Sequence, residues 1–209
     1  MPETRRLLEA ASALSQSLRA SGVPHAFHGS MFVAVLANSP QADEIFCIVE
    51  GGAVHPFRRV RQALAGSQDF VITPSPWSNR LHVKYHRCIP PVEVSVLSPT
   101  IHDSSSTRLP PQIEILPAGE AGPRRLDALT VLAVSGVPFL TISEFVRAKL
   151  KTWVIRGSER DAQDIAFVMT RYWNSIDINR VPEQDMDRFV ESVEAAASGW
   201  TAVKRKYGM

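Results

Sequence analysis

The sequence predicts an α+β fold in which a mixed β-sheet is flanked by helices and followed by C-terminal helices. Two observations lead to this fold class. Segments with helical and strand-like periodicity alternate through about residue 140, and only helical periodicity follows. This order indicates helices packed on a sheet, and it excludes an all-helical bundle and a β-sandwich.

Length and composition set the domain organisation and the class of partner. The chain has 209 residues, of which 44% are apolar, and this suits one compact unit. We expect an α/β core over 1–140 and a helical segment over 141–209 that packs on it. A net charge of +2 indicates neither nucleic acid nor a membrane as partner, and no run of about 20 apolar residues occurs. We therefore expect a cytoplasmic protein that acts on a small molecule.

The first elements follow from periodicity and from the residues that end helices. Leu7, Leu14 and Leu18 recur at helical spacing, and Gly22 then supplies a helix stop, which predicts a helix over 4–21. Pro56 suits the first turn of a later helix. The elements between them are expected to be, in order, a strand at 25–28, a helix at 31–37 and a strand at 44–50.

The remaining elements are expected from β-rich runs and then from helical stripes. His102 to Pro111, rich in serine and proline, is expected to form an exposed loop. The predicted strands are 69–73, 81–87, 92–97 and 112–116, and the predicted helices are 142–155, 159–173 and 182–197.

The stretch Phe27-His28-Gly29-Ser30, with Glu44-Ile45-Phe46 about fifteen residues later, is the most informative part of the chain. It resembles the opening of the minimal nucleotidyltransferases, including the abortive-infection toxin type. In that superfamily a Gly-Ser turn opens a helix, and the next strand carries an Asp-x-Asp pair that holds magnesium. The resemblance implies a nucleotidyltransferase-like fold with Phe46 in place of the second acid. Because a benzyl group cannot ligate Mg²⁺, it also implies a degraded metal site.

The resemblance extends to the C-terminal half, where family members carry an inward lysine and then a helix opened by acids. Here Lys149 precedes Asp161-Ala162-Gln163-Asp164, and the resemblance implies that Lys149 contacts nucleotide phosphates. Helical geometry also places Lys149 in an apolar stripe, where it must snorkel, serve a cleft or pair with a structural carboxylate. Glu144 and Asp161 stand three residues after a Thr or Ser, as in a capping box, and Asp164 is expected to be solvated.

The third family acid is expected on the predicted strand 92–97. Strand alternation puts Glu93 and Ser95 on one face. If the third acid of the family corresponds to Glu93, one metal ligand remains. If it corresponds to Ser95, this metal ligand is lost as well.

These observations lead to a hypothesis of a repurposed, metal-independent enzyme that acts on an apolar small molecule. Orientation of a substrate suits a cyclase or isomerase, including a Diels–Alder type of specialised metabolism. No metal or cofactor is expected. The candidate catalytic residues are Glu44, Lys149, His28 and Glu93, and the candidate substrate-binding residues are Gly29, Ser30, Phe46, Ser95 and Trp153.

Two alternatives remain open. The first is an active Mg²⁺-dependent nucleotidyltransferase with a displaced acid set of Asp43, Glu44 and Glu93. The second is a non-catalytic binding module that keeps the fold as a scaffold. The last predicted helix has an apolar side that could pack on its own domain or on a second copy of the chain. The sequence therefore leaves open whether the protein forms a homodimer.

Overall fold

Seven strands form the centre of the molecule in a computed structural model that describes residues 3–42, 44–74, 80–86, 110–120 and 122–209. They are β1 (His25–His28), β2 (Phe46–Val49), β3 (Phe70–Pro74), β4 (Leu81–Tyr85), β5 (Gln112–Pro117), β6 (Val131–Val134) and β7 (Val137–Leu140). Their order in one mixed sheet is β3-β4-β5-β2-β1-β7-β6. The β1–β7 and β2–β5 pairs are parallel, and the others are antiparallel.

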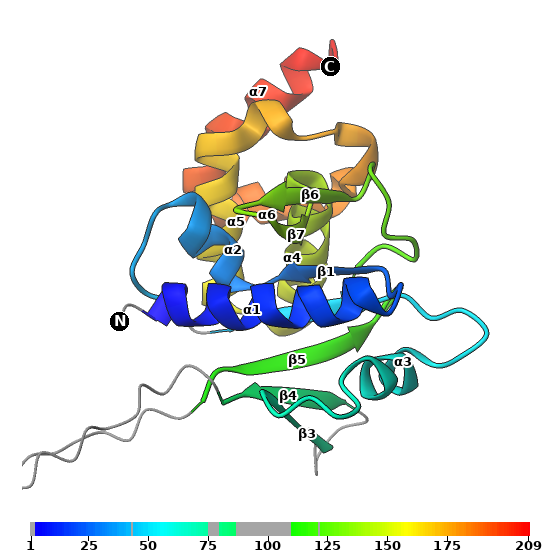
Figure 1. The fold of residues 1–209 in the computed structure, drawn as a ribbon. Coiled ribbons are helices and arrows are strands. Elements are labelled where there is room, and N and C mark those ends of the chain that lie inside the picture. The colour runs from blue at the N-terminus through cyan, green and yellow to red at the C-terminus, as the bar shows by residue number, and fades with distance from the viewer. Residues whose placement is uncertain (1–2, 43, 75–79, 87–109, 121) are drawn as a thin grey trace, which may run out of the picture.

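Helices lie on both faces of this sheet. They are α1 (Glu3–Ala20), α2 (Ser30–Leu36), α3 (Pro56–Ala63), α4 (Ile142–Arg156), α5 (Glu159–Tyr172), α6 (Glu183–Ser192) and α7 (Ala197–Lys206). Figure 1 shows α1 in front of the sheet and α4 behind it, and α7 at the top of the view. The α+β fold class is confirmed. None of the described helices is long and apolar enough to cross a lipid bilayer.

Four phenylalanine rings join the sheet to the helices that carry the site. Phe32 of α2 stacks on Phe139 of β7 at 5.1 Å between ring centroids, and it meets Phe145 of α4 edge-on at 5.0 Å. Phe27 of β1 lies 6.3 Å from Phe139. All four side chains are fully buried, so apolar burial holds α2 and α4 against the β1–β7 pair.

A buried histidine joins α1 to the first strand. His25 Nε2 lies 2.8 Å from Ser15 Oγ of α1, and Nδ1 lies 2.8 Å from the Val23 carbonyl oxygen. Both ring nitrogens are therefore satisfied, as buried polar groups require.

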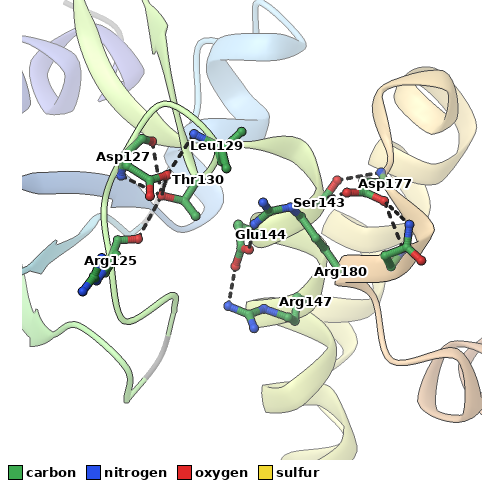
Figure 2. Close-up of polar contacts among 10 residues, drawn as sticks. Arg125, Asp127, Leu129, Thr130, Ser143, Glu144, Arg147, Asp177 and Arg180 are labelled. Carbon is green, nitrogen blue, oxygen red and sulfur yellow. Dashed lines mark hydrogen bonds and ion pairs between the residues drawn. The ribbon is translucent and has the colours of Figure 1, made fainter.

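The hairpin of β6 and β7 was not predicted from the sequence. Its turn residues, Ser135 and Gly136, both have positive φ values, 51° and 79°, as type I′ hairpin turns require. Serine is not a common residue in this conformation, so the sequence carries a weak turn signal. Figure 2 shows the loop before β6, where Thr130 Oγ1 donates to the Arg125 carbonyl oxygen and Asp127 accepts from the Leu129 amide.

The C-terminal prediction also needs a correction. The single helix expected over 182–197 is interrupted. After α6 the chain forms a short 3₁₀ turn over Glu194–Ala196, and α7 then begins. The break occurs at Val193, whose φ and ψ of −129° and 81° are not helical. The predicted strand 92–97 lies outside the described residues.

Candidate functional site

Three side chains from adjacent strands form a row on one face of the sheet. His28 of β1 is paired in register with Phe46 of β2, and Phe46 is paired with Glu114 of β5. Directly paired residues point to the same face, so the three side chains lie side by side. This row is the centre of the candidate site.

Glu114 is the site residue that sequence reasoning missed. The expected third acid was placed on 92–97, and Glu93 and Ser95 lie outside the described residues, so their roles stay predictions. The described strand beside β2 is β5, and its central acid is Glu114. The sequence does show an acid between the two apolar residues Ile113 and Ile115. Such a pattern does not indicate which strands are neighbours in the sheet, so it does not place Glu114 beside Phe46. Arg80 forms an ion pair with Glu114.

The Gly-Ser turn lies directly against Phe46. Gly29 has a φ of 109°, and a Cβ added there would lie 3.0 Å from the Glu44 carbonyl oxygen and 3.1 Å from Phe46 Cδ2. The Ser30 hydroxyl accepts from the Glu44 amide at 3.1 Å, and the Met31 amide donates to the Glu44 carbonyl oxygen at 3.2 Å. The polar groups of the turn are thus bonded to the backbone of the segment that leads into β2.

Lys149 lies at the centre of three carboxylates. Its Nζ is 2.7 Å from Asp161 Oδ1, 3.0 Å from Asp164 Oδ2 and 3.1 Å from Glu44 Oε1. The ammonium donates hydrogen bonds to Asp161 Oδ1 and Glu44 Oε1, and Asp164 Oδ2 adds an ion pair. The side chain is only 5% exposed. The expectation that Asp164 is solvated is therefore wrong: its residue is 8% exposed and it pairs with Lys149.

The carboxylates also govern the charge of this cluster. Burial by itself would lower the pKa of Lys149, but the carboxylates of Asp164, Asp161 and Glu44 together outweigh it and raise the pKa above its ordinary value. Burial raises the pKa of Asp164, and this effect exceeds the opposing effect of Lys149. Lys149 therefore stays protonated at neutral pH.

The turn between α4 and α5 brings these acids to the lysine. Gly157 ends α4 in the left-handed conformation, with a φ of 61°, and its amide bonds to the Trp153 carbonyl oxygen. Ser158 then caps α5, and its hydroxyl accepts from the Asp161 amide. The capping interpretation of the Ser158 segment is thus correct for the backbone, while the Asp161 carboxylate binds Lys149.

A cavity of about 200 Å³ opens over the row and beside Lys149. We call it the central pocket. Its sheet side is lined by His28, Glu44, Phe46, Arg80 and Leu116. Its helical side is lined by Ala148, Lys149, Thr152, Arg156, Ser158, Arg160 and Asp161.

His28 differs from the other polar residues of the pocket. Its residue is 6% exposed, and neither ring nitrogen has a hydrogen-bond partner within the described part of the chain. Burial, and secondarily the charge of Lys149, lowers the pKa of His28 to about 3, so the ring is neutral. Its two nitrogens are the buried polar atoms at the wall of the pocket that a bound molecule could satisfy.

Four residues singled out from the sequence lie outside the pocket lining, namely Gly29, Ser30, Trp153 and Glu144. Trp153 packs edge-on against Phe189 of α6 at 4.9 Å, so its indole contributes to the helical core. Glu144 is buried at the start of α4, where its carboxylate binds Arg147 and, at 2.8 Å, Arg180 (Figure 2). Thr141 makes no side-chain cap bond, so the capping box expected at Glu144 does not form.

The donor set fits a magnesium ion poorly. Phe46 offers no oxygen, Glu44 Oε1 faces the Lys149 ammonium, and Glu114 is paired with Arg80. Two cationic side chains therefore hold the carboxylates that a divalent ion would need. Among the residues that the structure describes, no group of three or more His, Cys, Asp or Glu is arranged to hold a metal ion.

Comparison with solved structures supports the expected fold. An antigenic nucleotidyltransferase-like protein from Paracoccidioides brasiliensis is similar at a TM-score of 0.58 and 15% identity, over 95% of this chain and 93% of that one. The JHP933 protein from Helicobacter pylori is similar at a TM-score of 0.53 and 13% identity, over 97% and 81% of the two chains. No protein-family model and no curated protein sequence matches. The chain therefore has a nucleotidyltransferase-like fold.

Proposed function

We propose that this chain is a repurposed nucleotidyltransferase-fold enzyme that acts on a small molecule in the central pocket without a divalent metal ion. The observation that carries the proposal is the position of Lys149 Nζ, within 3.1 Å of carboxylate oxygens of Glu44, Asp161 and Asp164. The ammonium supplies the positive charge that these acids need. Phe46 removes a ligand from the adjoining strand.

Contacts to nucleotide phosphates, which the resemblance implies, are also unfavourable in this chain. The resemblance implies that Lys149 would contact nucleotide phosphates. Here the ammonium is ion-paired with three carboxylates, and the Ser30 hydroxyl and Met31 amide are bonded to the Glu44 backbone. A triphosphate would have to displace these internal contacts, and each displaced polar group would cost free energy.

The reaction class that suits these groups is an intramolecular one. A cyclase or isomerase, including a Diels–Alder type, needs an oriented substrate and no co-reactant. Glu44 lines the pocket with a side chain that is 32% exposed, and the neutral His28 ring offers one N–H donor and one acceptor. In this proposal Glu44 and His28 contact the substrate, and Lys149 positions Glu44.

The test compares metal binding in the wild type and in Phe46→Asp. Mn²⁺ titration, followed by thermal stability and by the electron paramagnetic resonance signal, should show no binding to the wild type. Phe46→Asp adds a carboxylate beside Glu114, and a gain of Mn²⁺ affinity in this variant would show that the Phe46 ring contributes to excluding the ion from the wild type. Tight binding of Mn²⁺ and a nucleoside triphosphate by the wild type, with transfer of the nucleotidyl group to an acceptor, would overturn the proposal.

A non-catalytic binding module is the second candidate. It is favoured by Lys149, because a fully paired lysine suits a scaffold as well as an enzyme. Separate substitution of Glu44, Phe46 and Lys149 distinguishes the two candidates once a ligand is known. A binder should lose affinity in small steps, whereas an enzyme should lose nearly all turnover at one position at least.

A further inference from the structure

We propose that this chain forms a symmetric homodimer in which the edge strand β6 pairs antiparallel with β6 of a second copy, so that the sheet continues across the interface. The inference goes beyond the proposed function and does not depend on it. It follows from the backbone groups that β6 directs outward, from the apolar character of the strand, and from one internal hydrogen bond that selects the register.

The hydrogen-bond pattern of the β6–β7 hairpin determines which backbone groups face outward. β6 is the last strand at one end of the described sheet, and β7 is its only neighbour there. In a hairpin with a two-residue turn, the closing pair, Val134 and Val137, exchanges both backbone bonds, and bonded pairs then recur at every second residue. The bond of 2.9 Å from the Thr141 amide to the Thr130 carbonyl oxygen agrees with this alternation.

Val131 and Ala133 therefore direct their amide and carbonyl groups away from β7. The Val131 amide is used within the chain, because it donates to the Asp127 carbonyl oxygen at 2.9 Å. The Ala133 amide, the Ala133 carbonyl and the Val131 carbonyl are left without a backbone partner among the described residues. Such groups on an edge strand are a template for pairing with another strand.

The side chains of β6 do not protect this edge. Residues 131–134 read Val-Leu-Ala-Val, with no charge and no proline. Ala133 is exposed, and the other three residues are half-buried. Charged residues, prolines and bulges are the usual means by which proteins prevent pairing at a sheet edge. The strand at the opposite edge, β3, ends in Pro74, which cannot donate a backbone hydrogen bond.

The internal bond of the Val131 amide selects one register for the second strand. If Ala133 lies opposite Ala133 of the partner subunit, the two residues exchange both of their outward backbone bonds. If the strands were centred on Leu132 instead, the Ala133 carbonyl would face the partner's Val131, whose amide is already bonded to Asp127. That register leaves the Ala133 carbonyl without a donor, so the register centred on Ala133 is favoured.

The favoured register also brings apolar side chains together. Leu132 then lies opposite Val134 of the partner subunit, and the two-fold axis repeats this contact with the roles exchanged. Ala133 lies at the axis, where its small side chain allows the two strands to approach. Leu129, which is 69% exposed and directly precedes Thr130 and β6, adds apolar surface beside the interface. An uncharged strand meets no repulsion from its own copy, which makes a second copy the fitting partner.

The last predicted helix is not available as a dimer surface of this kind. Met186 and Phe189 of α6 are fully buried within the chain, and Phe189 packs on Trp153. Val190 and Val193 are packed against the same core. The apolar side that the sequence indicated is thus covered by the chain itself, whereas the outer side of β6 is not.

Measurement of the mass in solution tests the dimer. Light scattering and sedimentation of the full chain should show a mass that rises with concentration towards twice the 23.1 kDa of one chain. We expect a dissociation constant in the micromolar range, because the paired strand is short and the interface small.

Substitutions at Ala133 test the position of the interface. Ala133→Lys puts two like charges at the axis and should give a monomer, while Ala133→Ser, which adds no charge, should still dimerise. Ala133→Pro removes the outward amide and no bond to β7, so it should weaken the dimer about tenfold or more. Val71→Lys is the matched control, because Val71 is 46% exposed on the opposite edge strand, β3, and it should leave the dimer intact. Circular dichroism checks that each variant is folded.

A cross-link tests the register. Bonded antiparallel partners have Cα atoms about 5.5 Å apart, within the range of about 4.4–6.8 Å that a disulfide spans. Ala133→Cys should therefore give a disulfide-linked dimer on mild oxidation. Val71→Cys carries the same native Cys47 and Cys88 and should not cross-link.

The opposite outcomes are specific to this inference. A wild type that stays monomeric up to millimolar concentration, a dimer that persists in Ala133→Lys, or assemblies larger than two copies would overturn it. A dimer in which Ala133→Cys does not cross-link would overturn the register. Each of these results leaves the metal-independent function standing, because that proposal is tested by Mn²⁺ binding and nucleotidyl transfer.

Discussion

The ring of His28 lies against the ring of Phe46, with 5.0 Å between their centroids and 32° between their planes. The contact arises because the two residues are register partners on β1 and β2. Phe46 therefore covers one side of an imidazole that has no hydrogen-bond partner in the described chain. An apolar ring thus occupies the position beside the Gly29-Ser30 turn, and the adjacent histidine is neutral and buried.

Replacement of His28 should separate stability from ligand binding. His28→Phe removes two unsatisfied buried nitrogens, so the free energy of unfolding should rise by about 1–3 kcal/mol at pH 7. His25→Phe is the matched control, since it removes nitrogens bonded to Ser15 and Val23, and it should destabilise by a similar amount. Urea unfolding measures both. A loss of stability in His28→Phe equal to that in His25→Phe would contradict the unpaired state of His28.

Lowering the pH should reduce the free energy of unfolding, because His28 takes up a proton more readily in the unfolded chain. Its pKa is about 3 in the folded chain and an ordinary 6.5 in the unfolded chain, because burial opposes protonation. Between these values the unfolded state binds a proton that the folded state does not. The free energy of unfolding is therefore independent of His28 protonation above pH 6.5 and falls as the pH drops below it, by roughly 1.4 kcal/mol per pH unit.

The measurement is the free energy of urea unfolding at pH 7 and at pH 5. The wild type should lose about 2 kcal/mol more than His28→Phe over this interval, which covers about 1.5 pH units below the ordinary histidine pKa. His25 also has a lowered pKa, but it is present in both proteins and cancels in the comparison. Equal losses would show that His28 does not titrate in this way.

Removal of the Lys149 charge should strongly destabilise the chain. Lys149→Met leaves three carboxylates without their shared cation, and breaking a buried ion pair from one side costs about 3–5 kcal/mol. Lys151→Met, two residues along the same helix, is the control, because Lys151 is exposed and donates to the Glu120 carbonyl oxygen. Thermal and urea unfolding compare the two. A loss in Lys149→Met as small as in Lys151→Met would argue against the three-carboxylate cluster.

A methyl group at Gly29 should disturb the turn beside Phe46. Gly29→Ala combines an unfavourable φ of 109° with contacts of 3.0 and 3.1 Å to Glu44 and Phe46. Gly22→Ala, where φ is 61° and nothing lies within 4 Å, bears only the backbone cost, about 1 kcal/mol. The unfolding free energy should therefore fall further in Gly29→Ala. Similar losses in the two variants would indicate that the turn has room for a side chain.

The buried Glu144 carboxylate should matter for stability and not for the pocket. Glu144→Gln weakens the contact to Arg147 within α4 and the contact to Arg180, which joins α4 to the 3₁₀ turn over Ile178–Arg180 (Figure 2), and should cost about 1–3 kcal/mol. Glu159→Gln, exposed in the first turn of α5, is the control and should change stability little. Because Glu144 does not line the central pocket, Glu144→Gln should leave the binding of a small molecule there unchanged. A selective loss of affinity in Glu144→Gln would place Glu144 in the site.

Much of the fold was predictable because local patterns dominate it. The helix over Glu3–Ala20 and the strand over His25–His28 follow from apolar periodicity and a glycine stop, and both occur within one residue of the predicted bounds. The β6–β7 hairpin was missed because its Ser135-Gly136 turn lacks the usual residues. The break at Val193 was missed because no proline or glycine marks it.

The site was only partly predictable. The sequence indicated Lys149 as a polar residue in an apolar stripe, and left open whether it meets phosphates or carboxylates. The structure places it among three carboxylates, one of which, Asp164, was expected to be solvated. Glu114 was not singled out, because its importance depends on β5 lying beside β2.

The sequence alone determined the class of fold, the Gly29-Ser30 turn and the presence of Phe46 where an acid was expected. These are properties of short segments, set by side-chain periodicity and backbone preference. Only the tertiary structure decided which charges meet. Lys149 and Glu44 are 105 residues apart in the chain, and strand order together with the packing of α4 against the sheet at β7 brings them to 3.1 Å. Such a distance depends on the packing of the whole sheet, and no local pattern encodes it.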